Sequence, residues 1–224
     1  MEIGKYIDST NLKMDATSKD IEKLCKDAIE YGFETVCIHP SYIELAKSIL
    51  KDTNIGVCTV IGFPLGMHTP KTKVFEACEA LELGADEFDM VINVGALKEK
   101  DYDYVKREIE EVRDVLEGKT LKVIIETSLL TDDEIIKMTE ICNETFVNFI
   151  KTSTGFGTRG ASVHDVELMH KYKSDTLEIK AAGGIKTFEQ MNELIEKGAT
   201  RIGTSNGVNI VKSMEEIKWN YMMN

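Results

Sequence analysis

The sequence has little of several residue types, and each shortage excludes a class of protein. Three prolines and 16 glycines among 224 residues rule out a collagenous or proline-rich chain. Five scattered cysteines form no Cys-x-x-Cys pair, which argues against a zinc ribbon and against a disulfide scaffold. The longest mostly apolar stretch, 57–67, is interrupted by threonine, glycine and proline, whereas a membrane span needs about 18 apolar residues. With no hydrophobic leader at its start, the sequence predicts a cytoplasmic protein without a membrane partner.

Basic residues are also in the minority. The chain has 27 Lys and Arg against 39 Asp and Glu, a net charge of −12. This balance argues against a nucleic-acid partner, because phosphate backbones demand clustered Lys and Arg. It remains compatible with a small phosphorylated substrate held by local groups. The 42% of hydrophobic residues is typical of a globular protein with a packed core.

Short apolar, β-branched runs alternate with amphipathic segments along the whole chain. The segments 19–30, 71–83 and 101–117 are predicted helices that end at a glycine, and Thr131 with Glu134 and Thr187 with Gln190 form capping boxes that begin two more. The apolar runs, which we predict to be strands, are 6–7, 35–38, 57–61, 88–92, 121–125, 147–150, 177–179 and 201–202.

Eight strands in 224 residues leave 28 residues per unit, since 224/8 = 28. A strand of about five residues, a helix of about 11 and two short loops fill that length. Strict alternation implies parallel strands joined by right-handed crossovers, so we predict an α/β fold, a single-domain (β/α)₈ TIM barrel over residues 1–224. A doubly wound open sheet is the alternative, but its glycine-rich loop should follow the first strand. That position holds Asp8, Ser9 and Thr10.

Charged residues fall on the inward-facing positions of several predicted strands. Alternation along the strands directs Asp89, Lys122, Glu126, Glu178 and Lys180 into the barrel. Unpaired charge in such a place is costly, so we expect opposite charges to meet there. Several titratable groups in one confined space indicate a functional site.

Two lysines stand where strands six and seven end. Lys151 and Lys180 each follow apolar residues, and two neighbouring ammonium groups disfavour each other's protonation. A neutral amine can attack an aldehyde and form an imine. A salt-bridged structural pair is the alternative. Asp89, flanked by Phe88 and Met90, is either a proton shuttle or a buried ion-pair partner, and the same two roles are open for Asp8.

Glycine-rich loops follow the last three predicted strands. Residues 155–160 match Gly-x-Gly-x-x-Gly, but after the sixth strand we favour an anion-binding loop over a dinucleotide site. Residues 181–186 and 203–207 follow strands seven and eight, where barrels often bind phosphate; simple turns are the alternative. Cys37 and His39 lie two residues apart on a strand, which favours a buried thiol and a histidine at the barrel mouth over a catalytic pair. No histidine shows metal-ligand spacing, so we expect no metal.

The segment 149–156, FIKTSTGF, resembles the deoxyribose-phosphate aldolase family, class I aldolases built on a (β/α)₈ barrel. The resemblance covers nearly the whole chain, and its motifs follow the predicted strands in order. The other similar segments are DSTNL at 8–12, VCIHP at 36–40, VIGFPLG at 60–66, GADEFDMVIN at 84–93, KVIIET at 122–127, KAAGGI at 180–185 and GTS at 203–205.

This resemblance implies a reversible cleavage of 2-deoxy-D-ribose 5-phosphate to D-glyceraldehyde 3-phosphate and acetaldehyde. Lys151 is then the imine-forming nucleophile, Lys180 the lysine that keeps it neutral, and Asp89 the proton donor and acceptor. The lysine replaces the metal of a class II aldolase, so no cofactor is expected. The implied substrate- and phosphate-binding residues are Asp8, Thr154, Gly155, Gly183, Gly184, Ile185, Gly203, Ser205 and Asn206. We also expect a homodimer or larger homo-oligomer.

The sequence departs from the family pattern at three places. Asn206 stands where the family often has a second serine after Ser205, and Phe156 where some members have lysine, so Lys186 is a candidate for that charge. Some members end in a tyrosine that reaches the active site, and Tyr221 is the candidate here. Two rival functions stay open: another barrel enzyme acting on sugar phosphates, such as an isomerase or a longer-sugar aldolase, and a non-catalytic phosphate-binding barrel.

Overall fold

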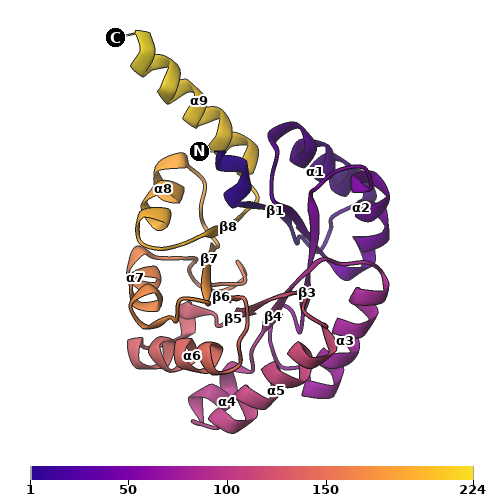
Figure 1. Cartoon of the computed structure of the whole chain (residues 1–224), viewed down its shortest axis with the longest axis vertical. Helices are drawn as coiled ribbons and strands as arrows, with labels where there is room; N and C mark the ends of the chain where they lie inside the picture. Colours follow the sequence, from indigo (N-terminus) through magenta and orange to yellow (C-terminus); the bar gives the residue numbers. More distant parts are fainter. Residues whose placement is uncertain (1, 224) are drawn as a thin grey trace.

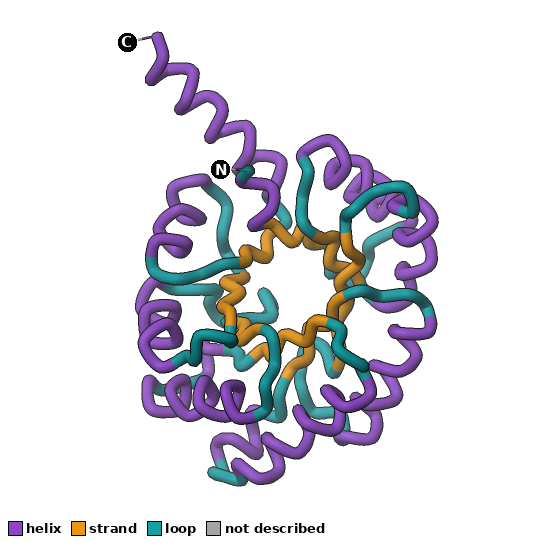
Figure 2. Tube along the Cα trace, viewed as in Figure 1, coloured by secondary structure: helices purple, strands orange, loops and turns teal. Residues whose placement is uncertain are grey.

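Eight parallel strands close into a barrel at the centre of the molecule (Figure 2). The computed structural model describes residues 2–223, with side chains up to residue 216. Each strand pairs with the next in sequence, and β8 pairs with β1 to close the barrel. The strands are β1 Ile7–Asn11, β2 Thr35–Ile38, β3 Gly56–Ile61, β4 Glu87–Val91, β5 Thr120–Ile124, β6 Phe149–Lys151, β7 Glu178–Ala182 and β8 Arg201–Thr204. The predicted (β/α)₈ barrel is confirmed.

Helices surround this barrel on all sides (Figure 1). The two predicted capping boxes are present, with Thr131 and Thr187 as caps. None of the described helices is long and apolar enough to cross a membrane. The α-helices are α1 Ser18–Tyr31, α2 Ile43–Leu50, α3 Pro70–Glu82, α4 Val94–Lys98, α5 Tyr102–Val115, α6 Asp132–Glu144, α7 Val163–Tyr172, α8 Phe188–Glu196 and α9 Gly207–Met223, and the 3₁₀ helices are η1 Ile3–Tyr6, η2 Pro40–Tyr42 and η3 Thr127–Leu129.

The strands separate an apolar exterior from a charged interior. Met90, Val123 and Ile179 are fully buried in the core that the helices share with the outer face of the strands. Their neighbours in sequence point the other way, because side chains alternate along a strand. The register aligns Asp89 with Lys122, and it aligns Lys151 with Lys180. Opposite charges therefore meet inside the barrel, as expected.

The sixth strand begins later than its apolar run. β6 starts at Phe149, directly after Asn148, whose side chain is bonded to neighbouring groups. Its Oδ1 accepts hydrogen bonds from Nη1 of Arg113 at 3.1 Å and from the backbone N–H of Leu121 at 2.9 Å. The polar residue is thus satisfied next to α5, and Lys151 keeps its inward position.

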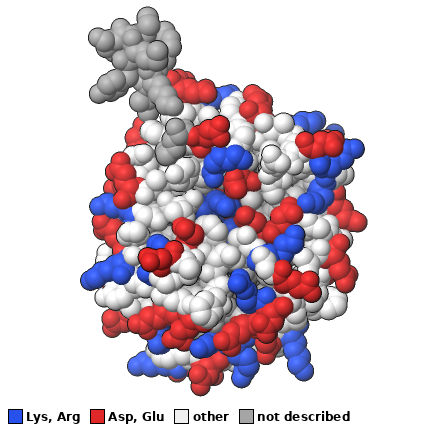
Figure 3. All heavy atoms as spheres, in the orientation of Figure 1, with Lys and Arg blue, Asp and Glu red and all other residues white. Residues whose placement is uncertain are grey.

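The outer surface carries charge of both signs. Figure 3 shows Lys and Arg side chains intermingled with Asp and Glu over the visible face.

Candidate active site

The carboxylate of Asp89 lies at the centre of the charged interior. Its Oδ1 accepts a hydrogen bond from Lys122 Nζ at 2.8 Å, and its Oδ2 accepts one from Lys151 Nζ and one from Lys180 Nζ, each at 2.7 Å. Burial alone would raise the pKa of Asp89, but the three lysine charges outweigh it and hold this pKa well below its usual range. Asp89 is therefore held as an anion by the three ammonium groups.

Lys180 bridges two carboxylates. Besides Asp89, its Nζ lies 2.5 Å from Asp8 Oδ2, as an ion pair without the alignment of a hydrogen bond. The other oxygen of Asp8 accepts a hydrogen bond from Arg201 Nη1 at 2.8 Å. Burial by itself would lower the pKa of Lys180, yet Asp8 and Asp89 together raise it above its ordinary value. Lys180 thus stays an ammonium ion.

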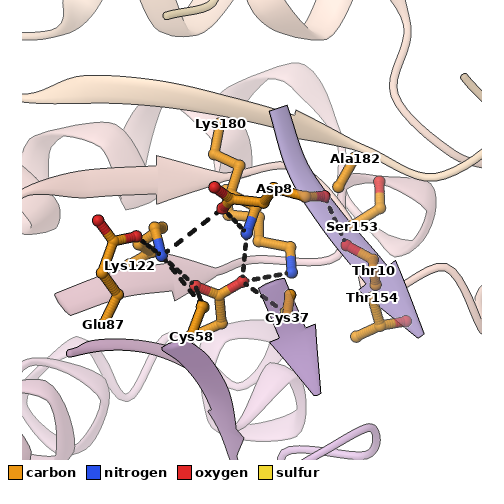
Figure 4. Close-up of polar contacts among 12 residues, drawn as sticks. Asp8, Thr10, Cys37, Cys58, Glu87, Lys122, Ser153, Thr154, Lys180 and Ala182 are labelled. Atoms are coloured by element: carbon orange, nitrogen blue, oxygen red, sulfur yellow. Dashed lines mark hydrogen bonds and ion pairs between the residues drawn. The ribbon is translucent and has the colours of Figure 1, made fainter. Parts of the chain in front are cut away.

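Lys122 occupies a similar position on the other side of Asp89. Its Nζ lies 2.6 Å from Glu87 Oε2, and the same oxygen accepts a hydrogen bond from Arg201 Nη1 at 2.9 Å. Burial opposes the charge, but nearby carboxylates raise the pKa of Lys122 well above its usual value. Figure 4 shows Lys122 between Glu87 and Cys58, with Asp8 and Lys180 beside it.

Two buried cysteines adjoin this network. Cys58 Sγ lies 3.2 Å from Asp89 Oδ1 and 3.2 Å from Lys122 Nζ, and Cys37 Sγ lies 4.0 Å from Asp89 Oδ2. Burial raises the pKa of Cys58 well above its ordinary value, so it remains a neutral thiol. The thiols and Asp89 lie close enough together to bind a metal ion, and so do Asp8, Cys58 and Glu87. In both groups lysine ammonium ions already bind the carboxylates.

A cavity of about 850 Å³ opens above the network. Lys151 is the one lysine of the three around Asp89 that lines this cavity. The residues predicted to bind substrate that also line it are Thr154, Gly155, Gly183, Gly184, Ile185, Gly203, Ser205 and Asn206. Asp8 is the exception: it is fully buried and bound to Lys180 and Arg201, below the cavity. Its contacts fit the ion-pair role that the sequence left open.

The loops after β7 and β8 present backbone donors to the cavity. Gly183 and Gly184 both have positive φ, at 87° and 76°, a conformation that glycine adopts without strain. Among the hydrogen bonds between described residues, the backbone N–H groups of Gly184, Ile185 and Ser205 have no acceptor within the protein. The N–H of Asn206, in contrast, donates to the hydroxyl of Thr204 at 2.9 Å. Three free N–H groups from two loops form a cradle for an anion.

The loop after β6 is held from below by Glu126. Its carboxylate oxygen Oε2 accepts hydrogen bonds from the backbone N–H of Thr154 at 3.1 Å and from the Thr154 hydroxyl at 2.5 Å. Glu126 is 5% exposed and has a φ of 52°, a left-handed conformation that is unfavourable for a glutamate. Thr154 thus directs both donors to Glu126, and its hydroxyl is not free to donate to a ligand.

Aromatic side chains stand at the mouth. Phe156 is half exposed and packs edge-to-face on Phe63, with 5.5 Å between ring centroids. His39 contacts the other edge of Phe63, and its Nε2 lies 3.1 Å from the carbonyl oxygen of Leu12. His39 therefore packs at the mouth, away from the ion-pair network. The side chain of Tyr221 lies outside the described residues.

Residues 3–213 match the model of the DeoC/LacD family aldolases. The chain belongs to this family. It is 57% identical to the deoxyribose-phosphate aldolase of Thermococcus gammatolerans, over 95% of this chain and 96% of the relative. The deoxyribose-phosphate aldolase of Finegoldia magna is 55% identical, over 95% of this chain and all of the relative.

Solved structures of aldolases have the same fold as this chain. A putative deoxyribose-phosphate aldolase from Coccidioides immitis superposes with a TM-score of 0.93 at 42% identity, over 96% of this chain and 86% of that one. A tetrameric deoxyribose phosphate aldolase from Aeropyrum pernix gives 0.89 at 29% identity, over 96% and 92%. The resemblance expected from the motifs is confirmed.

The sequence did not predict a role for several residues of this site. Glu87 and Arg201 join the interior network from strands four and eight, and Cys58 adjoins it from strand three. Arg201 ends up beside Glu87 only through closure of the barrel, a contact that spans 114 residues of sequence. The local sequence holds no signal for such a contact, whereas alternation alone indicates the inward positions of Lys122, Lys180 and Asp89.

Proposed function

We propose that this protein is a class I aldolase, a lyase that reversibly cleaves 2-deoxy-D-ribose 5-phosphate to D-glyceraldehyde 3-phosphate and acetaldehyde in deoxyribonucleotide catabolism. The observation that carries the proposal is that Lys151, hydrogen-bonded to Asp89, is the barrel lysine that meets the cavity. The match to a family of aldolases supports the reaction. Relatives named deoxyribose-phosphate aldolase, at 57% and 55% identity, support the substrate.

The charge count explains how Lys151 acts as a neutral amine. Four cations, Lys122, Lys151, Lys180 and Arg201, face three carboxylates in the barrel interior. A proton on Lys151 has no counter-charge of its own, and Lys151 has the fewest carboxylate contacts of the four cations. The free amine adds to the C1 aldehyde of the substrate, and water leaves to give a protonated imine.

The protonated imine then withdraws electrons from the sugar. A base removes the C3 hydroxyl proton, the C2–C3 bond breaks, and glyceraldehyde 3-phosphate departs. The remaining enamine takes a proton at C2, and water hydrolyses the imine to release acetaldehyde and the free amine. Asp89 is the acceptor and donor of these protons, with the Lys180 ammonium and a water molecule. The imine supplies the electron sink, so the reaction requires no metal or other cofactor.

The phosphate binds at the far end of the cavity from the ion-pair network. The free N–H groups of Gly184, Ile185 and Ser205 donate to its oxygens, and Gly203 lines the cavity where a Cβ would crowd Ala182 and Lys180. Lys186, which also lines the cavity, supplies a positive charge. Gly155 and Asn206 complete the rim, and Thr154 holds the rim in place through Glu126.

The protein acts in the cytoplasm as a homo-oligomer in this proposal. A tetrameric relative from Aeropyrum pernix supports the oligomer.

One assay tests the reaction. Purified protein is supplied with 2-deoxy-D-ribose 5-phosphate, and acetaldehyde release is followed through a coupled alcohol dehydrogenase. Acetaldehyde and glyceraldehyde 3-phosphate should form in equal amounts. Isomerisation of the sugar without carbon–carbon cleavage, or binding without turnover, would replace this proposal by one of its rivals.

A further inference from the structure

The ion pairs of the barrel interior close into a ring of six side chains. The ring alternates in sign throughout: Glu87 binds Lys122, Lys122 binds Asp89, Asp89 binds Lys180, Lys180 binds Asp8, Asp8 binds Arg201, and Arg201 returns to Glu87. The nitrogen–oxygen distances around it run from 2.5 Å to 2.9 Å. Three carboxylates and three cations make the ring electrically neutral.

Lys151 stands outside this ring. Its Nζ contacts only one ring member, Asp89, whereas the Nζ of Lys180 contacts two carboxylates. A proton on Lys151 would therefore give the interior an excess charge of +1. Because Lys151 is 3% exposed, water screens that excess poorly. The six ring members already balance one another, so no carboxylate charge is left over for Lys151.

We propose that Arg201 and Glu87, which do not line the cavity, are positioning residues that set the protonation of Lys151 by closing this neutral ring. The inference rests on the proposed function of Lys151 as the imine-forming amine. Arg201 leaves Asp8 and Glu87 no unpaired charge for Lys151 to balance. Glu87, in turn, balances Lys122 and Arg201. Neither residue touches Lys151, so each acts through the other members of the ring.

Charged and titratable groups surround Lys151 on all the other strands. They are Asp8 on β1, Cys37 on β2, Cys58 on β3, Glu87 and Asp89 on β4, Lys122 and, just beyond its end, Glu126 on β5, Glu178 and Lys180 on β7, and Arg201 on β8. Of these, Glu126 is bound by Thr154 and Ser128, away from the ring, and Glu178 is only half-buried, at the start of β7 opposite Phe149. We therefore expect a substitution in the ring to affect Lys151 through the total charge of the barrel interior.

The two residues should shift imine formation in opposite directions. Arg201→Met removes a cation and leaves a carboxylate that a protonated Lys151 can balance, so imine formation should require higher pH. Glu87→Gln removes an anion and raises the excess positive charge, so imine formation should persist to lower pH. The double variant Glu87→Gln/Arg201→Met removes one charge of each sign and should behave like the native protein. Arg201→Lys keeps the charge and should also preserve the native profile.

The measurement is the rate at which acetaldehyde is trapped on Lys151 as a function of pH. The amine adds to the aldehyde carbon, water leaves, and cyanoborohydride delivers hydride to the imine, which leaves a stable N-ethyl lysine. The adduct is located by peptide mass spectrometry. We expect the midpoint of the Arg201→Met profile to rise by about one pH unit, or about tenfold slower trapping at neutral pH. The midpoint of Glu87→Gln should fall by a similar amount.

Controls separate charge from structural damage. Circular dichroism identifies variants that fold, and Cys37→Ser in each background removes a buried thiol whose titration could overlap. If Arg201→Met does not fold, the difference between Glu87→Gln and the double variant still decides the sign. Shifts in the same direction, or an unchanged midpoint in folded variants, would overturn the role of the ring. Absence of any adduct on Lys151 in the native protein would instead overturn the proposed function.

Discussion

Lys151 and Lys180 donate hydrogen bonds to the same carboxylate oxygen, Asp89 Oδ2, each at 2.7 Å. They differ in what else surrounds them. Lys180 is fully buried and has Asp8 as a second partner, whereas Lys151 lines the cavity. Of the two, only Lys151 meets the cavity, which is what its proposed role as the nucleophile requires.

Replacing Lys180 should slow the reaction without removing the nucleophile. Lys180→Met leaves Asp8 and Asp89 short of one cation, and a proton on Lys151 then restores the balance. Trapping of acetaldehyde should be at least about tenfold slower at neutral pH and should recover as pH rises, because the free-amine fraction grows about tenfold for each pH unit. Lys180→Arg keeps the charge and should retain part of the rate. Loss of trapping at every pH in folded Lys180→Met would contradict this division.

Substitution of Gly184 should discriminate between phosphorylated and free sugar. A Cβ at Gly184 would meet nothing within 4 Å of the protein, so it would project into the space assigned to the phosphate. Gly184→Ala should raise KM for deoxyribose 5-phosphate by about tenfold or more and leave kcat/KM for free deoxyribose nearly unchanged. Gly118→Ala is the matched control, with positive φ, no contact within 4 Å and no place in the cavity. Equal effects on both sugars would show that this loop does not bind the phosphate.

Activity should survive exhaustive chelation. Cys37, Cys58 and Asp89 lie within metal-binding distance of one another, but the ammonium of Lys122 binds both Asp89 and Cys58. A metal ion would have to displace that charge. Turnover after EDTA treatment should match turnover before it. Loss of turnover that zinc restores would indicate a class II mechanism.

Acid should destabilise the barrel through Asp8. Burial opposes the charge of this carboxylate, but Lys180, Lys122 and Arg201 together hold its pKa far below the ordinary value. A depressed pKa in the folded state contributes stability above the unfolded value of about 3.9 and loses it as pH falls toward the folded value. The free energy of unfolding should therefore fall steeply below about pH 4.

Asp8→Asn tests this contribution. It should cost about 3–5 kcal/mol at neutral pH, as the loss of a buried ion-pair partner does, and should flatten the acid dependence. Urea unfolding measured from neutral pH down to strong acid gives both quantities. Asp175→Asn, at an exposed position, is the control and should keep the native slope. An unchanged slope in Asp8→Asn would show that Asp8 is not held as an anion.

The sequence predicted the barrel because strand–helix alternation is a local pattern, repeated eight times. Alternation predicted the inward positions of Lys180 and Asp89, whereas Lys151 was found from its place after the apolar residues that end the sixth strand. The contacts of Glu87 and Arg201 could not be predicted, since they depend on the register between strands and on closure of the barrel.

The sequence did not predict that Glu126 holds the loop between β6 and α7, and the reason is a different one. Alternation placed Glu126 inward with the charged cluster, but its left-handed backbone turns the carboxylate toward Thr154 instead. Nothing in the sequence around Glu126 indicates that its backbone adopts a positive φ. The family resemblance groups Asp8 with the substrate-binding residues. Its burial and its ion pair with Arg201 depend on β8, at the other end of the chain.

The location of the trapped adduct tests the central claim most directly. Native protein is incubated with acetaldehyde and cyanoborohydride, digested, and analysed by peptide mass spectrometry alongside Lys151→Arg, whose guanidinium stays protonated and forms no imine. We predict an N-ethyl group on Lys151, none on Lys180, and no adduct at either position in Lys151→Arg. An adduct on Lys180 in the native protein, with Lys151 unmodified, would contradict the assignment of Lys151 as the nucleophile.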